Sequence, residues 1–137
     1  MRAVTGFAAM AAAAGLAGCM PEPEVSGRAD FLALCAPCHG PAGTGGGAAA
    51  AGLAKAPADL TLIAARNGGT FDYAAVMSLI DGYTRYDSGQ VMPHFGALLE
   101  GDTVLVDLGD GVMTPTPERH FGLAQYLASI QTVGDRP

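Results

Sequence analysis

Apolar residues recur at helical spacing toward the end of the chain. The repeating positions are Leu123, Tyr126, Leu127 and Ile130. This pattern predicts a last helix with one buried face. The residues before it mark its start, with Thr116 as N-cap, Pro117 at the first helical position and Glu118 in the first turn.

The middle of the chain is rich in loops and predicts two short helices. Residues 59–65 form one helix, which Asn67-Gly68-Gly69 closes. Residues 72–82 form the other, and its inward positions are Val76, Met77, Leu79 and Ile80. Residues 103–108 instead alternate apolar and polar positions and are followed by Asp110-Gly111, which predicts an extended flap or a small hairpin.

The first 18 residues read as a leader rather than as part of the fold. A charged start at Arg2 precedes an uncharged, alanine-rich run that is too short for a good membrane span and fits a secretory segment. Leu16-Ala17-Gly18-Cys19 follows and resembles the lipobox of bacterial lipoproteins. We therefore expect cleavage before Cys19 and a lipid on its sulfur, followed by an extended, proline-rich tether over 19–26. An ordinary signal peptide or an uncleaved anchor helix is the alternative.

The charge balance is acidic, with 13 Asp and Glu against 7 Lys and Arg and a formal net charge of −6. No basic run is present, which argues against a nucleic-acid partner. An acidic surface favours a protein partner with a basic face.

Half of the residues are apolar, but many are alanine, and there are 20 glycines and no tryptophan. Such a core buries little area per residue and leaves room for a prosthetic group.

The segment that carries chemistry is Cys35-Ala36-Pro37-Cys38-His39. Two cysteines three residues apart, with histidine next, form the signature of covalent c-type haem attachment. In this arrangement Cys35 and Cys38 bind the two vinyl groups, and His39 binds the iron. Three other readings are a thioredoxin-like dithiol, half of a zinc site and a structural disulfide. No βαβ pattern and no second Cys/His pair at zinc spacing accompany the motif. Because only one C-x-x-C-H is present, we expect one covalent haem c.

With this motif the sequence resembles a class I bacterial cytochrome c over residues 27–132, followed by a short tail at 133–137. Gly27-x-x-x-Phe31-x-x-x-Cys35 matches the first helix of the family, and Leu123-x-x-Tyr126-Leu127 matches the last. The resemblance implies an all-α fold in which these helices cross around one haem, with the flap before the last helix. It also implies that Gly27 allows the close crossing and that Phe31 packs beside it.

The family supplies a methionine as the second iron ligand, usually followed by proline, and Met92-Pro93 fits this pattern. The competitors are Met77, Met113 and His94, whereas we expect His120 at the surface or as a cap. By the resemblance, Leu53 and Leu60 line the haem and Arg85 binds a propionate, with Arg66, Tyr83 and Tyr86 as further propionate candidates. The family also has a Gly-Pro whose region gives a carbonyl to the proximal histidine, but residues 45–49 lack a proline.

The expected function is one-electron transfer by a protein that is not an enzyme, because a His/Met-ligated haem cycles between ferric and ferrous states. We expect it on the periplasmic side of a bacterial membrane, anchored at Cys19 and meeting redox partner proteins with a basic face. It would act as a tethered carrier or as a subunit of a redox complex. The alternative is a haem-based sensor or small-ligand enzyme with a labile sixth ligand.

Overall fold

The structure, a computed structural model, describes residues 23–83 and 91–132. These residues are mainly helical, with one antiparallel two-stranded sheet, so the all-α expectation holds only in coarse terms. The predicted leader over 1–18, Cys19, Arg85, Tyr86 and the tail at 133–137 lie outside the described residues. The helices are α1 (Pro23–Asp30), η1 (Phe31–Cys35), α2 (Ala36–His39), η2 (Ala48–Ala50), η3 (Leu60–Leu62), α3 (Ile63–Arg66), α4 (Tyr73–Asp81), η4 (Gly96–Leu98) and α5 (Glu118–Ser129); the strands are β1 (Thr103–Asp107) and β2 (Met113–Pro117).

The first helical stretch runs without a break through α1, η1 and α2. It begins at Pro23, so the expectation of an extended tether is wrong for residues 23–26. Proline is well suited to a first helical turn, because its φ is already helical and its missing N–H would have had no partner there. Residues 19–22 lie outside the described part. The η1 segment is a π-helical turn, a wider turn that often marks a functional position in a helix.

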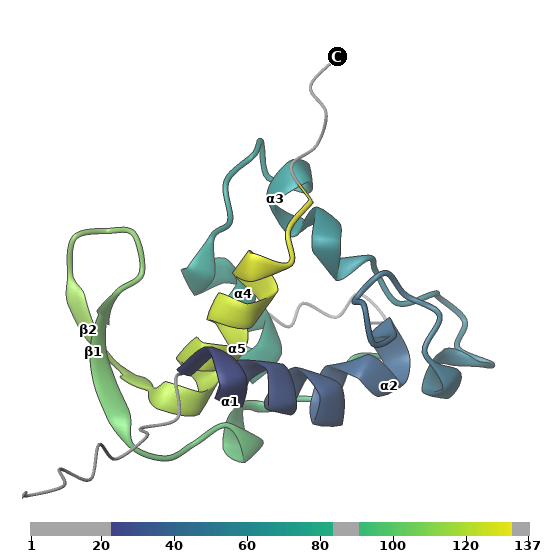
Figure 1. Cartoon of the computed structure of the whole chain (residues 1–137), viewed down its shortest axis with the longest axis horizontal. Coiled ribbons are helices and arrows are strands. Elements are labelled where there is room, and N and C mark those ends of the chain that lie inside the picture. The colour runs from purple at the N-terminus through teal and green to yellow at the C-terminus, as the bar shows by residue number, and fades with distance from the viewer. Residues whose placement is uncertain (1–22, 84–90, 133–137) are drawn as a thin grey trace, which may run out of the picture.

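Helices α1 and α5 cross (Figure 1), and a glycine of each helix lies at the crossing. A β-carbon on Gly27 would lie 2.0 Å from the carbonyl oxygen of Gly122. Beside this contact the rings of Phe31 and Tyr126 are 5.1 Å apart between centroids. The close crossing predicted for Gly27 and the packing of Phe31 are therefore confirmed.

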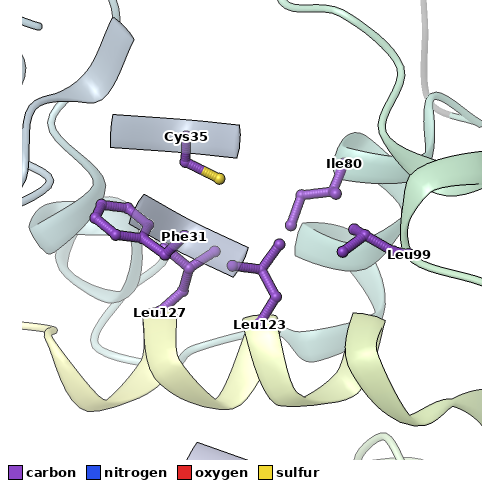
Figure 2. Packing of buried hydrophobic residues seen from close by; sticks show 6 residues of the cluster. All are labelled: Phe31, Cys35, Ile80, Leu99, Leu123 and Leu127. Carbon is purple, nitrogen blue, oxygen red and sulfur yellow. The ribbon is translucent and has the colours of Figure 1, made fainter. Parts of the chain in front are cut away.

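The main buried cluster is formed by residues of η1, of α4, of α5 and of the end of η4. Its members are Phe31, Cys35, Ile80, Leu99, Leu123 and Leu127. Figure 2 shows the Cys35 sulfur pointing toward the other members of this cluster, from the helix that faces α5. One cysteine of the C-x-x-C-H motif is thus part of the hydrophobic core.

An ion pair between Arg119 and Asp30 joins the start of α5 to the end of α1. Asp30 is buried, and Arg119 donates to both of its carboxylate oxygens, from Nε to Oδ2 and from Nη2 to Oδ1. The second NH group of Arg119 donates to the carbonyl of Leu98 at 2.9 Å. The pair therefore holds three segments together beside the glycine crossing.

The start of the last helix differs from the prediction by one residue. Pro117, not Thr116, occupies the N-cap position and has no side-chain capping bond. Thr116 is buried in β2, and its hydroxyl donates to the Thr114 carbonyl at 3.1 Å. The N–H of Glu118 instead donates to the Asp102 carbonyl at 2.8 Å. The strand takes Thr116 because it pairs with Val104 across the hairpin.

The two short helices of the middle are confirmed. Asp59 caps η3 by accepting a bond from the Thr61 N–H at 2.8 Å, and α3 continues to Arg66. Asp72 caps α4 by accepting from the Ala75 N–H at 2.9 Å, and Gly82 ends that helix at a φ of 102°. Met77 and Ile80 are buried as predicted and Val76 is half-buried, but Leu79 is 39% exposed, because it lies on the outer side of α4.

Strands β1 and β2 form the predicted hairpin, with Thr103 opposite Pro117 and Asp107 opposite Met113. In Figure 1 the hairpin lies at the left edge of the molecule and α2 at the right. Within the described residues, no helix has the length and apolar character needed to cross a membrane.

Candidate functional site

The motif Cys35–His39 lies where the first helical stretch ends, in η1 and α2. Cys35 is buried, and burial, with the nearby Asp30 as the smaller cause, raises the pKa of its thiol to about 12. Cys38 is half-buried, and neither cysteine forms a disulfide. A reactive redox dithiol needs a lowered thiol pKa, so the environment of Cys35 is the opposite of a thioredoxin-like site.

A zinc site at this motif would need further donor side chains close by. No group of three or more His, Cys, Asp and Glu residues suited to a metal ion comes together in the part of the chain that the structure describes. Haem attachment makes no such demand, because the porphyrin supplies four of the iron ligands and the protein supplies only axial ones.

The imidazole of His39 is held by a backbone carbonyl. Its Nδ1–H donates to the Ala58 carbonyl oxygen at 2.8 Å. This bond fixes the tautomer and makes Nε2 the ring atom that can bind a metal, and it also increases the basicity of the ring. The family resemblance places this carbonyl in the region of residues 45–49, but here it belongs to Ala58, which follows Pro57.

The glycine loop after the motif packs back onto it. The N–H groups of Gly45 and Gly47 donate to the carbonyls of His39 and Cys38, at 2.7 and 3.1 Å. A β-carbon on Gly47 would lie 2.2 Å from the Pro37 carbonyl oxygen. Only glycine permits this approach, so the loop packs directly on the backbone of the motif.

The segment that carries Ala58 is in turn fixed to the end of α5. The side-chain amide of Gln131 accepts from the Ala64 N–H at 2.9 Å and donates to the carbonyls of Leu60 and Leu127 at 2.8 and 2.7 Å. Next to it, the N–H of Thr132 donates to the Thr61 carbonyl at 2.9 Å. Sequence reasoning did not identify Gln131, because an isolated glutamine after a helix carries no pattern.

Met92 is half-buried and packs against the cluster that contains Cys35. The two other described methionines are placed differently. Met77 is buried on α4 outside that cluster, and Met113 is 57% exposed on β2. His94 is exposed and lies against Gly82. Of these candidates, Met92 is the one whose side chain packs against the cluster that contains Cys35.

The predicted haem-lining residues are brought together only in part. Leu60 packs against the cluster that contains Cys35, whereas Leu53 is half-buried and is not part of that packing. Arg85 lies outside the described residues. Of the other propionate candidates, Arg66 donates to the Asp59 carbonyl at 2.7 Å, and Tyr83 is 85% exposed.

His120 is not at the surface, contrary to the sequence-based expectation. Its side chain is buried, and its Nε2 has no hydrogen-bond partner among the described atoms. Burial lowers the pKa of this imidazole, and the Asp81 carboxylate and the Met77 backbone oppose that effect. The position three residues before Leu123, on the same helix face, is the signal that could have indicated burial.

The donor set of this site fits a covalently bound haem. Two unpaired thiols stand at the attachment spacing, and the histidine after them already has its Nδ1 occupied. Comparison of the chain with models of protein families, with curated proteins and with solved structures finds no match.

Proposed function

We propose that this protein transfers single electrons through one covalent haem c, in the fold of a class I cytochrome c. The observation that carries the proposal is the bond from His39 Nδ1 to the Ala58 carbonyl within a C-x-x-C-H motif. An imidazole held in this way is ready to bind iron through Nε2. The burial of Cys35 and the raised pKa of its thiol argue against the competing dithiol chemistry.

When bound, the haem supplies a one-electron couple between ferric and ferrous iron. Cys35 and Cys38 would hold it as thioethers, His39 would bind the iron on one side, and Met92 on the other. The thioether sulfur of methionine favours the ferrous state and so raises the reduction potential. Leu53 and Leu60 would exclude water from the ring edge, and Arg85 would pair with a propionate.

The proposal includes a location and a partner class. A leader over 1–18 and a lipobox-like Cys19 support export and lipid anchoring on the periplasmic side of a bacterial membrane. The net charge of −6 supports redox partners with a basic face.

The test is to express the chain with a c-type maturation system and to compare visible spectra of wild type, Met92→Leu and Met113→Leu. We expect haem that survives denaturing electrophoresis, and a weak far-red sulfur-to-iron band in the oxidised wild type. Met92→Leu should abolish that band. Met113→Leu is the matched control, because its side chain is exposed and should leave the band unchanged.

Two outcomes would contradict the proposal. If the far-red band survives Met92→Leu, another residue is the sixth ligand. A high-spin haem that binds carbon monoxide readily in the wild type would instead support the sensor or small-ligand enzyme.

A further inference from the structure

One face of the β1–β2 hairpin is mainly apolar and has no partner in the described chain: Leu105, Met113, Pro115 and Pro117 share it with Thr103 and Asp107. Cross-strand neighbours share a face of a two-stranded sheet, and the register places Leu105 opposite Pro115 and Met113 opposite Asp107. Leu105 is 62% exposed, Met113 57% and Val112, in the turn, 58%. Large apolar side chains gathered on one exposed face indicate an interaction site.

The tip of the hairpin is ordered by its own carboxylates. Asp107 accepts from the N–H groups of Gly109 and Gly111 at 2.8 and 2.9 Å, and these bonds lower its pKa. Asp110 accepts from the Val112 N–H at 2.9 Å. The apolar face is therefore presented in a fixed shape, which reduces the entropy lost when a partner binds.

The rim of this face is uniformly acidic. Residues 91–118 contain five carboxylates and no lysine or arginine, and the next residue, Arg119, is paired with Asp30. The carboxylates, all exposed, are Glu100, Asp102, Asp107, Asp110 and Glu118. A basic surface complements this rim, whereas a second copy of the same hairpin or an anionic lipid surface would be repelled.

The strand edge itself is blocked. Pro115 and Pro117 both lie in β2, and two residues apart they remove two N–H donors from the same edge. A strand from a second chain could therefore not pair along β2. A partner that meets β2 would bind through side chains, such as those of the apolar face, rather than by strand pairing.

We propose that the β1–β2 hairpin docks the protein onto a partner protein whose basic surface surrounds an apolar centre. The hairpin and α2 lie on opposite sides of the molecule (Figure 1), so docking at the hairpin would leave the Cys38–His39 end free. The partner would hold the protein in place without covering that end. This inference does not depend on the presence of haem.

The test uses the full, matured chain and two synthetic peptides of equal length and charge, one of alternating Lys and Leu and one of alternating Lys and Ser. Calorimetric titration should give an affinity about tenfold higher for the Lys–Leu peptide, which would fall as salt is raised. The variant Leu105→Ser/Met113→Ser should lose that preference. Glu100→Gln/Asp102→Asn should weaken the binding of both peptides, because it removes two negative charges from the rim. Neither side chain holds the turn, so the hairpin should keep its shape.

Leu62→Ser is the matched control, since Leu62 is also exposed but belongs to η3, which contacts the opposite end of α5. Its affinities should equal those of wild type. Three results would overturn the proposal: equal affinities for the two peptides in wild type; a dimer that Leu105→Ser/Met113→Ser dissociates; or phosphatidylcholine-vesicle binding that the same variant, but not Leu62→Ser, weakens. The visible spectrum of each variant should equal that of wild type. A lost peptide preference with an unchanged spectrum would then be due to the hairpin and not to the haem site.

Discussion

Gly27 of α1 lies directly against the backbone of Gly122 of α5, so close that a β-carbon on Gly27 would be 2.0 Å from the Gly122 carbonyl oxygen. Because the neighbour is backbone, it cannot rotate away. The same crossing positions the helix that ends in Cys35 and His39. Any separation of the two helices would therefore shift the C-x-x-C-H motif as well as the core.

Gly27→Ala should destabilise the protein by about 1–3 kcal/mol, because the added methyl group forces the helices apart. Denaturant unfolding would measure the loss. Ala29→Ser, at an exposed position of α1, should change stability by less than about 0.5 kcal/mol. A Gly27→Ala protein as stable as wild type would mean that the crossing is looser than the structure indicates.

Arg119→Met should cost about 1–3 kcal/mol of stability, because it leaves the buried Asp30 carboxylate without its partner. Adding Asp30→Asn should recover part of that loss, since the buried charge is then gone. Thermal or urea unfolding of the two single variants and the double variant provides the measurement. Arg28→Met, on an exposed arginine of α1, is the control. Strictly additive losses would show that the pair contributes no coupling.

His120→Leu should leave stability unchanged or raise it at neutral pH, because it removes a buried nitrogen that has no hydrogen-bond partner among residues 23–83 and 91–132. It should also flatten the dependence of stability on pH. Burial lowers the pKa of His120 in the folded protein. The free energy of unfolding is therefore unaffected by this group above its unfolded pKa of about 6.5, and it decreases as the pH falls below that value. Urea unfolding at about pH 7.5 and about pH 5 would measure this. An equal drop in wild type and variant would assign the pH dependence elsewhere.

Asp59→Asn should reduce the acid sensitivity of the protein. The Thr61 hydroxyl and N–H donate to the Asp59 carboxylate at 2.6 and 2.8 Å and lower its pKa. Its stabilising contribution is therefore present above the unfolded pKa of about 3.9 and is lost as pH falls through the lower folded value. Unfolding midpoints between about pH 5 and pH 2 would test this. Glu100→Gln should behave as wild type there, and a parallel acid loss in Asp59→Asn would refute the assignment.

Local chemistry made several elements predictable from sequence. The capping residues Asp59 and Asp72 and the terminating Gly82 mark helices that the structure contains. The alternation over 103–108 marks a hairpin. The role of Gly27 followed from a family resemblance, but its partner Gly122 did not, because a glycine inside a helix does not reveal what it faces.

The errors arose where tertiary contacts override local signals. Thr116 has the chemistry of an N-cap, but strand pairing takes it first. His120 is polar, yet the helix face it shares with Leu123 is buried. The acceptor for His39 is 19 residues away in the chain, and only the folded loop shows that the carbonyl comes from Ala58. The iron ligands, the haem and the lipid anchor remain predictions.

The bonds of Gln131 and Thr132 have a consequence for how the protein opens. They join the end of α5 to residues 60–64, directly after the carbonyl that holds His39. Fraying of the last helix would therefore release the segment that orients the imidazole, so the two would open as one cooperative unit. Amide hydrogen exchange in this segment and at the end of α5 would then proceed at a shared rate, set by the C-terminal turn.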